Sequence, residues 1–350
     1  MIPAEDCEDI LARTAPLWEE LRGKRLFITG GTGFFGQWLL GSFLHINDRL
    51  NLDAQVWILS RREHPTTHTH PALTFVHGDV RNFTFPEASF SHIIHAATTS
   101  AAETFHGEPP LSKIDTVVEG TRRVLDFAAH CRATKFLLTS SGNAYGQMPA
   151  HAQTFHEDDQ CSPDLTTPIA SALGESKRIA ELLTRIYANT HGFEAKIGRC
   201  FTFIGPHLPL DIHYAIGNFI RDALDGRPIV VEGDGTPLRS WMYMTDLTVW
   251  LWTLLFRGVP NRLYNVGSDE AVSVGDAAQR VASLTNTSVI FKNVIETRLT
   301  ASPNIYVPDT RRITRELCVT RTVDLNEAIH KTVKFYKSLS VASRMIEFGE

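Results

Sequence analysis

The segment Lys24-Arg-Leu-Phe-Ile-Thr-Gly-Gly-Thr-Gly-Phe-Phe-Gly36 decides the fold of this chain. Its first six residues, 24–29, are rich in β-formers and predict a strand, whereas residues 37–44 predict a helix. Between them, Gly30, Gly33 and Gly36 form a GxxGxxG turn. Glycines at these positions tighten the turn, admit a diphosphate and let the helix pack against the strand. This order of strand, glycine turn and helix predicts a dinucleotide whose diphosphate lies on the helix N-terminus.

The rest of the first 201 residues repeats the alternation of strand and helix. Further β-rich runs occur at residues 55–59, 73–77, 92–96, 135–140 and 194–198. Helix-length segments such as 112–130 and 175–191 separate them. The alternation predicts a Rossmann-type, doubly wound parallel α/β sheet with helices on both faces over residues 1–201.

Beyond residue 202 the pattern changes. Glycine and proline interrupt the segments at positions 205, 206, 226, 228, 233 and 235. Such breaks predict a smaller, mixed α/β lobe over residues 202–350, with crossovers of the chain back to the first domain. The length of 350 residues fits two such units.

The composition is that of an ordinary globular protein, with 43% hydrophobic and 21% charged residues. It excludes collagen-like, disordered and coiled-coil chains. The formal charge of −5 provides no attraction to nucleic acid or to an anionic membrane. Neither is therefore an expected partner.

The expected location is the cytoplasm. The five cysteines are scattered and form no CxxC pair, which favours a reducing compartment over a disulfide framework. The N-terminus is acidic where a secretory signal would be basic, and the longest apolar run, residues 247–256, is too short to span a membrane. His64, His68 and His70 share one loop with no carboxylate or thiolate pattern nearby, so we expect no metal site.

The end of the second strand bears on the choice of dinucleotide. An NAD site has a carboxylate there for the ribose hydroxyls, but this strand runs into Ser60, Arg61 and Arg62. The missing acid and the two arginines favour NADP, with NAD as the alternative. Asp79 and Val80, which follow the third strand, are expected near the adenine.

With these features, the chain resembles the extended short-chain dehydrogenase/reductase family, in particular its NAD(P)-dependent nucleotide-sugar epimerases and dehydratases. The resemblance covers most of the chain, and its motifs lie at residues 29–36, 78–80, 95–98, 140–146, 174–177, 205–206, 233–235 with Arg239, and 264–267. It implies a nucleotide-diphosphate sugar as substrate. It also implies dinucleotide contacts from Thr32, Phe34, Phe35, His95, Ala96, Ala97 and Thr98, besides the three glycines.

The family's catalytic set is a Ser or Thr together with a YxxxK pair on a helix. The serine matches Ser141 and the lysine matches Lys177, but Leu173 stands where the family has tyrosine. Positions four apart share one helix face, so Leu173 and Lys177 are expected side by side. Leucine neither accepts a proton nor donates a hydrogen bond, so it cannot perform the family's acid–base step. The resemblance leaves Ser141 to orient the reacting oxygen and Lys177 to hold the nicotinamide ribose.

Three hypotheses account for the leucine. In the first, another residue acts as the base, with Tyr145 as the leading candidate and His156, Glu157 and His151 after it. In the second, the reaction does not begin with oxidation of a hydroxyl, as when a substrate that already carries a ketone is epimerised through an enediolate. In the third, the protein binds dinucleotide and sugar without converting them, as a silent or regulatory protein.

The two residues that directly follow the serine differ between subclasses of the family. The 4,6-dehydratases carry an Asp–Glu pair there, whereas this chain has Gly142 and Asn143. Neither of these can act as acid or base in the elimination of water. The sequence therefore favours epimerisation or keto-sugar reduction over dehydration.

The resemblance also implies where the sugar nucleotide and a second copy of the chain bind. The expected substrate contacts are Ser141, Asn143, Thr202, Asn218 and Arg239. Among them Arg239 has a rigid donor fork that matches the oxygens of a diphosphate. Similar proteins form homodimers through the two helices predicted here over residues 112–130 and 175–191.

Overall fold

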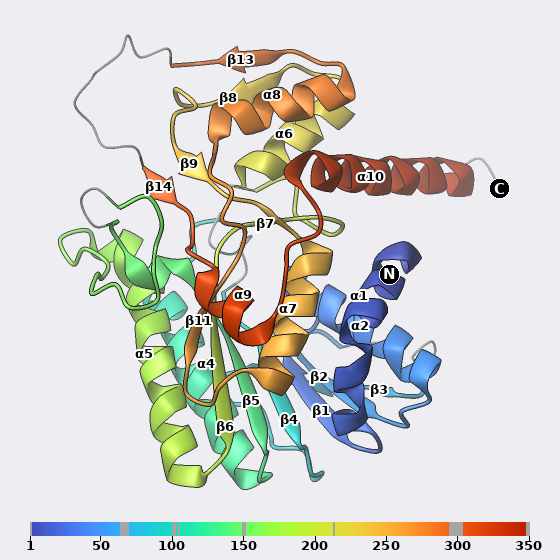
Figure 1. Ribbon diagram of the computed structural model, residues 1–350, viewed down its shortest axis with the longest axis vertical. Coiled ribbons are helices and arrows are strands. Elements are labelled where there is room, and N and C mark those ends of the chain that lie inside the picture. The colour runs from blue at the N-terminus through green and yellow to red at the C-terminus, as the bar shows by residue number, and fades with distance from the viewer. Residues whose placement is uncertain are drawn as a thin grey trace.

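The computed structural model describes residues 2–63, 70–99, 103, 106–148, 152–212, 214–293 and 304–347, with side chains described up to residue 339. At its centre lies a seven-stranded parallel sheet in the order β11-β6-β5-β4-β1-β2-β3 (Figure 1). The strands are β1 (Arg25–Thr29), β2 (Gln55–Ser60), β3 (Leu73–His77), β4 (His92–His95), β5 (Lys135–Ser141), β6 (Glu194–Cys200) and β11 (Leu263–Val266). The predicted Rossmann-type sheet is confirmed.

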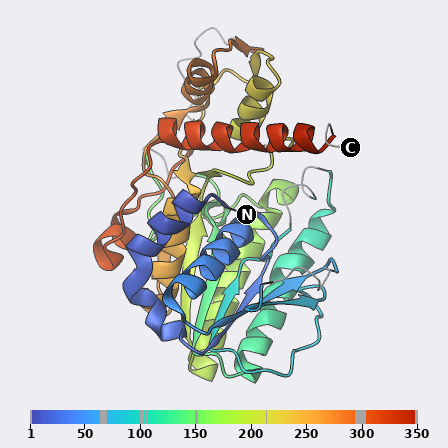
Figure 2. The ribbon, with the colours of Figure 1, turned by 90° about the vertical axis from the view of Figure 1, so that its right-hand side faces the viewer.

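Each face of the sheet has its own layer of helices and its own apolar core (Figures 1 and 2). On one face α4 (Pro110–His130) and α5 (Pro168–His191) pack against each other. The other face carries α1 (Ala4–Thr14), the 3-10 turn η1 (Ala15–Leu21), α2 (Phe34–Leu50) and α7 (Met244–Arg257). A strand that is covered on both faces is buried on both sides, and all four residues of β4 are buried.

Helix α1 lies in a segment that the sequence patterns left as an acidic lead-in. It packs along α7 and α2, and it buries Cys7 and Ile10 in the same core as Trp18 of η1. Asp6 is also buried, where it accepts hydrogen bonds from Tyr243 (2.8 Å) and Lys331 (2.6 Å). Because the segment is acidic, the sequence patterns did not reveal that one face of this helix is apolar.

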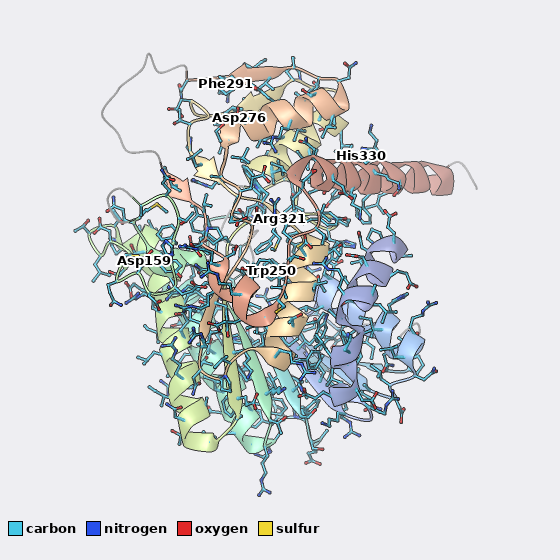
Figure 3. All side chains as sticks on the ribbon, in the orientation of Figure 1. Asp159, Trp250, Asp276, Phe291, Arg321 and His330 are labelled. Atoms are coloured by element: carbon cyan, nitrogen blue, oxygen red, sulfur yellow. The ribbon has the colours of Figure 1, made fainter. Side chains whose placement is uncertain are left out.

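The smaller lobe contains α6 (Ala215–Leu224), β8 (Ile229–Val231), α8 (Val274–Thr285) and β13 (Val289–Phe291), with α10 (Leu325–Glu347) packed against α6 and α8. Figure 3 labels Asp276 on α8 and Phe291 on β13. Ser273 begins α8, because its side chain accepts a hydrogen bond from the Asp276 N–H (2.9 Å). The short elements that join the lobe to the sheet are β7 (Phe203–Ile204), β9 (Leu238–Arg239), β10 (Met242–Tyr243), β12 (Val272–Ser273), β14 (Ile305–Tyr306) and α9 (Arg311–Leu317).

The chain returns to the large sheet after it has entered the lobe. Helix α7 packs on β5 and β6, and β11 pairs with β6 at the edge of the sheet. Residues of the second half of the chain thus form part of the large sheet and its helix layer, and the division into domains at residues 201 and 202 stays a prediction. Among the described residues, no helix combines the length and the apolarity that a membrane span requires.

Asp246, in the first turn of α7, connects both ends of the chain to the fold. Its carboxylate is buried and accepts hydrogen bonds from the Arg13 guanidinium (2.7 Å) and from the N–H groups of Thr322 (3.0 Å) and Val323 (3.1 Å). Trp250, one turn further along α7, donates to the carbonyl of Thr320 (3.3 Å). The N-terminal helix and the C-terminal segment thus both donate hydrogen bonds to the buried Asp246 carboxylate.

We expect Asp246→Ala to lower the free energy of unfolding by about 3 kcal/mol, because Arg13 and two N–H groups lose their buried acceptor. Urea denaturation measures the loss. Asp9→Ala removes the more exposed carboxylate that also pairs with Arg13 (3.1 Å), and it should cost less than about 0.5 kcal/mol. Equal losses in the two variants would contradict the assignment.

Candidate active site

In the glycine turn after β1, backbone atoms pack directly against one another. Gly30 has a φ of +73°, and a Cβ on it would lie 2.7 Å from the carbonyl oxygen of Ala96. A Cβ on Gly36 would lie 2.2 Å from the carbonyl oxygen of Gly30. Helix α2 begins after Gly33 and has no side-chain cap, so its first N–H groups are left for another acceptor. The turn and the first N–H groups of α2 form a cradle of backbone atoms at a helix N-terminus. Such a cradle fits the diphosphate of a dinucleotide.

The strand order reverses at this turn. The chain runs from β1 outward through β2 and β3, and it then returns to β4 on the other side of β1. In open parallel sheets, ligands bind beyond the carboxyl ends of the strands at such a point. The residues Thr32, Phe34 and Phe35 belong to this turn and to the start of α2, as expected. Ala96, Ala97 and Thr98 follow β4, and the backbone of Ala96 and Ala97 lies against Gly30.

His95 differs from its expected role as a cofactor contact. Its ring is buried between Thr29 (2.7 Å from Nδ1) and Thr121 (3.0 Å from Nε2), and burial lowers its pKa to about 3. Both ring nitrogens of this neutral imidazole are used inside the protein. The Ala97 N–H donates to the same Thr29 hydroxyl (3.2 Å). His95 therefore shapes the loop that follows β4, and its side chain is removed from the set of cofactor contacts.

The loop after β2 presents two arginines. The Ser60 hydroxyl closes a tight turn with the N–H (3.1 Å) and carbonyl (3.0 Å) of Arg62. Arg61 pairs with Glu103 (2.6 Å), and Arg62 is exposed with no ion-pair partner among the described residues. No carboxylate follows β2 directly, and the preference for NADP over NAD stays a prediction.

The expected place of Asp79 and Val80 near the adenine stays a prediction. Two Asp79 carboxylate oxygens accept from Arg81 (2.9 Å each), and this hydrogen bonding lowers the Asp79 pKa. Val80 is buried against Gly120 of α4, where a Cβ would lie 2.9 Å away. The structure thus gives both side chains partners within the protein. The histidines at positions 64 and 68, from the loop between β2 and β3, lie outside the described residues.

Ser141 and Lys177 come together at the carboxyl end of β5. The Ser141 hydroxyl accepts from the Asn143 N–H (3.1 Å) and so begins the 3-10 turn η3 (Gly142–Tyr145). Lys177 is buried on α5, and its ammonium donates to the carbonyl of Thr139 in β5 (3.0 Å). Burial lowers the pKa of Lys177 to about 8. The structure thus holds a buried, titratable amine behind the serine loop.

Leu173 lies one helical turn before Lys177. It is partly buried and packs against the apolar core beneath α4 and α5. The next residue, Gly174, lets α5 approach η3 closely, because a Cβ there would be 2.4 Å from the carbonyl oxygen of Asn143. The position one turn before Lys177 is therefore aliphatic, and the residue after it is the one that approaches the serine loop.

Tyr145, the leading substitute base, has a structural role instead. It is fully buried, and its hydroxyl donates to the Asn265 side chain (2.7 Å). Its ring stacks on Phe155 (centroids 4.9 Å apart) and carries the Arg199 guanidinium 4.2 Å above it. Arg199 in turn forms two hydrogen bonds to Glu181 (2.9 and 2.7 Å). Burial raises the Tyr145 pKa, so we withdraw Tyr145 as a catalytic base.

The loop candidates also have other partners. His156 approaches the Asp309 carboxylate (3.3 Å) and is partly exposed. Glu157 is buried, which raises its pKa, and it accepts from the Asn265 N–H (2.9 Å). These contacts hold the loop against β11. His151 lies outside the described residues.

The role of Arg239 as a phosphate ligand stays a prediction. It lies on β9 and donates to the carbonyls of Leu238 (2.8 Å) and Asn304 (2.9 Å), and no carboxylate pairs with it within the described part of the chain. Burial lowers its pKa. Asn218, on α6, accepts from Arg221 (3.2 Å), and the Thr202 hydroxyl contacts the carbonyl of Ser240. Among the expected substrate contacts, Arg239 is the one positively charged side chain.

Tyr306 is a site residue that the sequence patterns did not indicate. Strand β14 pairs in parallel with β9, which sets Tyr306 opposite Arg239. Its hydroxyl reaches the serine loop, because a Cβ on Gly142 would lie 2.6 Å from it. Only a two-residue strand carries Tyr306, and such a short strand has no periodicity from which its direction follows.

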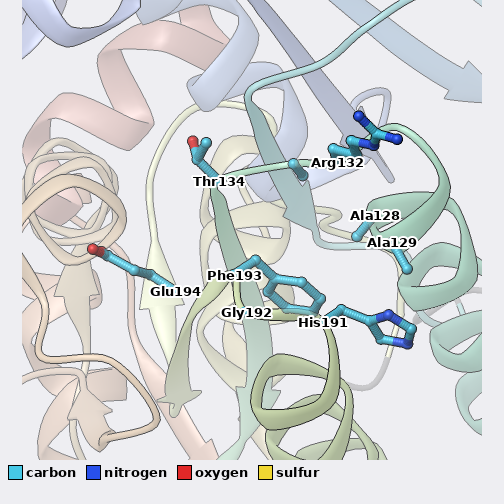
Figure 4. Close-up of a pocket in the computed structure, with 9 residues that line it drawn as sticks. Ala128, Ala129, Arg132, Thr134, His191, Gly192, Phe193 and Glu194 are labelled. Carbon is cyan, nitrogen blue, oxygen red and sulfur yellow. The ribbon is translucent and has the colours of Figure 1, made fainter.

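A surface hollow lies at the opposite end of the sheet (Figure 4). It is lined by the last turns of α4 and α5 and by the segments that lead into β5 and β6, including Arg132, His191 and Phe193. This is the amino end of the parallel strands, where open α/β sheets do not bind their ligands. Among the described residues, no group of histidine, cysteine and carboxylate side chains has the arrangement of a metal site.

Comparison with known proteins agrees with this geometry. Residues 26–267 match the model of the NAD dependent epimerase/dehydratase family. UDP-glucuronic acid decarboxylase 6 of Arabidopsis thaliana is 30% identical over 274 residues, which cover 78% of each chain. The UDP-glucose 4-epimerase of Thermotoga maritima, solved with UDP-glucose, has a TM-score of 0.75 at 18% identity and covers 90% of this chain and 99% of its own.

A dTDP-glucose 4,6-dehydratase of Bacillus anthracis, solved with NAD, has a TM-score of 0.73 at 18% identity and covers 90% of this chain and 97% of its own. These structural likenesses concern the fold. The family match covers the glycine cradle, the serine loop, α5 and β11, which is most of the site described above. The chain therefore belongs to the NAD-dependent epimerase/dehydratase family, whose members act on nucleotide sugars.

Proposed function

We propose that the protein reduces the ketone of a nucleotide-diphosphate keto sugar with NADPH. The observation that carries the proposal is Leu173, which lies one turn before the buried Lys177 and next to Gly174, the residue of α5 that approaches the Ser141 loop. A leucine at this position cannot take a proton from a sugar hydroxyl, so a reaction that begins with oxidation lacks its base. A substrate that already carries a ketone requires a proton donor and no such base.

The candidate site residues support distinct binding roles. The backbone of residues 30–36 and the segment 96–98 would hold the dinucleotide, whose reduced nicotinamide, when bound, supplies a hydride to the carbonyl carbon of the sugar. Lys177 would bind the ribose hydroxyls, and Ser141 would donate to the carbonyl oxygen and orient it. Arg239, which has no carboxylate partner among the described residues, would bind the diphosphate.

The test uses the purified protein with NADPH and UDP-4-keto-6-deoxyglucose, and in parallel with the dTDP form. We expect NADPH to be consumed in step with the appearance of a new sugar hydroxyl, and UDP-glucose with NADP to give no NADPH. The reaction is repeated in heavy water. Deuterium on the carbon beside the ketone would instead support epimerisation, and binding of either sugar without NADPH consumption would contradict the reductase.

A silent binding protein is the second candidate, and Leu173 is also the observation that favours it. The cradle, Lys177 and Arg239 would then bind the dinucleotide and the sugar nucleotide with no proton transfer. The same assay separates the two functions, since a silent protein binds both ligands and consumes no NADPH.

The preference for NADP rests on Arg61 and Arg62. We expect the double variant Arg61→Ala and Arg62→Ala to bind NADPH about 10- to 100-fold more weakly, because each charged hydrogen bond to a phosphate contributes about 1.5 kcal/mol or more. NADH lacks the ribose phosphate, so its dissociation constant should not change. Fluorescence titration of both dinucleotides measures the difference, and equal losses for NADPH and NADH would contradict the preference.

A homodimer is also part of the proposal. Ile179, Leu182 and Ile186 are exposed on one side of α5, with exposed fractions of 42, 58 and 49%, and Ile169 lies further along the same helix. Exposed apolar stripes of this kind favour a protein interface. A second copy of the chain would cover this stripe from both α5 helices, as a two-fold interface requires.

We expect Leu182→Glu to shift the protein from dimer to monomer in size-exclusion chromatography with light scattering. Burial of two symmetry-related carboxylates in an apolar interface costs several kcal/mol, on the order of the stability of the interface itself. Leu284→Glu, at a similarly exposed leucine of α8, is the matched control and should stay dimeric. A wild-type monomer would refute the dimer directly.

A further inference from the structure

The phenol of Tyr306 lies beside the serine loop. The position of a Cβ on Gly142 is 2.6 Å from its hydroxyl oxygen and 2.9 Å from the ring carbon that carries it. Any larger residue at 142 would therefore collide with the phenol. The glycine that removes the acid of a dehydratase thus creates the room in which Tyr306 reaches Ser141.

The surroundings of the hydroxyl are those of a site group. The Ser141 side chain, the backbone of Asn143 and Arg239 all lie close enough to the hydroxyl to act on its pKa. The ring is held by Phe201 (centroids 4.8 Å apart) and by Phe155 (6.4 Å). Burial raises the pKa of the phenol, so it is held in its protonated form. A protonated phenol beside the residue that orients a carbonyl oxygen is placed to donate a proton.

Tyr306 also connects the two halves of the site. It is opposite Arg239 in the pairing of β14 with β9, so the diphosphate ligand and the phenol lie on adjacent strands. A sugar whose diphosphate is bound at Arg239 would extend toward Ser141 and pass the phenol. Tyr145, by contrast, has its hydroxyl committed to Asn265 within the core.

We propose that Tyr306 is the proton donor of the reaction and takes the place of the tyrosine that is missing at position 173. The inference rests on the proposed reduction. As the carbonyl carbon gains a hydride, the Oη–H bond of Tyr306 breaks and its proton goes to the carbonyl oxygen. The electron pair of the former C=O π bond becomes the new O–H bond. The pair of the broken Oη–H bond stays on the phenolate, which takes a proton from water before the next turnover.

The first test compares Tyr306→Phe with wild type in the NADPH assay on UDP-4-keto-6-deoxyglucose. We expect kcat to fall by about 10²- to 10⁴-fold, the range of a lost general acid, while the dissociation constant of UDP stays the same. Tyr187→Phe removes one phenol from the far part of α5, where it donates to Asp126 (2.6 Å), and it should retain full activity. An unchanged kcat in Tyr306→Phe would overturn the inference.

A rescue variant separates a proton donor from a merely structural tyrosine. Leu173→Tyr in the Tyr306→Phe background restores a phenol one turn from Lys177. We expect it to recover about a tenth or more of the lost kcat, since the reaction regains a proton donor within the same site. A structural defect caused by the loss of Tyr306 would not be corrected by a phenol on α5.

A second measurement needs no turnover. When UDP-glucose is added to the protein with NADP bound, the ultraviolet difference spectrum of tyrosine should report the sugar at the phenol of Tyr306. Tyr306→Phe should abolish this signal and Tyr187→Phe should keep it. A signal that persists in Tyr306→Phe overturns the inference. If Tyr306→Phe loses the signal but wild type reduces no keto sugar, the contact at Tyr306 is supported and the proposed function is refuted.

Discussion

Replacement of Lys177 with methionine should stabilise the protein by about 3 kcal/mol at neutral pH while it lowers kcat by about 10²-fold or more. The amine is buried, and burial lowers its pKa from 10.5 to about 8. A group that holds its proton less tightly when folded destabilises the fold wherever the unfolded chain is protonated. Methionine has a similar length and carries no charge, so it removes this penalty.

The stability gained by Lys177→Met should depend on pH. Below pH 8 the amine is charged in both states, and the full penalty is present. Between pH 8 and about 10.5 the folded state has lost the proton that the unfolded state keeps, so wild type gains stability as the pH rises. The advantage of Lys177→Met should therefore disappear across this window. Thermal and urea unfolding over that pH range measure it.

Lys196 supplies a matched control for this prediction. Its side chain is also buried, and burial also lowers its pKa, but it pairs with Glu194 (2.7 Å) at the far end of β6. Lys196→Met should therefore leave kcat unchanged. The interpretation is wrong if Lys177→Met is less stable than wild type at neutral pH, or if it keeps its activity.

Gly36→Ala is expected to weaken dinucleotide binding by about 10²-fold, because overpacking of this kind costs up to about 3 kcal/mol. The new Cβ would lie 2.2 Å from the Gly30 carbonyl oxygen and 2.4 Å from the Gly31 carbonyl carbon. These are backbone atoms, which cannot rotate away, so the start of α2 must move away from the turn. Calorimetric titration with NADPH measures the loss.

Gly233→Ala is the control, because a Cβ at this position meets no atom within 4 Å. The variant should bind NADPH as wild type does. If Gly36→Ala binds the dinucleotide with unchanged affinity, the glycine turn is not its cradle.

Local patterns were sufficient for six of the seven strands and for the glycine turn, whereas β11 comes from a segment that the patterns assigned to the smaller lobe. The run from Lys24 to Gly36 predicted β1, the turn and α2, because the hydrogen bonds and steric contacts that form them join residues a few positions apart. For the same reason the four-residue spacing predicted that Leu173 and Lys177 share one face of α5. Acidic residues concealed α1, whose apolar face is recognisable only against α7.

Roles that depend on what surrounds a side chain could not be derived in this way. Tyr145 and His95 have the chemistry of site residues, but Asn265 binds the first and two threonines bind the second, and these partners lie far away in the sequence. Tyr306 reaches Ser141 only because β14 pairs with β9. The sequence by itself determined the glycine turn, the lysine helix and the absence of the usual tyrosine, since these are properties of single positions and short spacings. Only the tertiary structure decided which phenol is buried as support and which one faces the serine, because burial and hydrogen bonding arise when distant segments pack together.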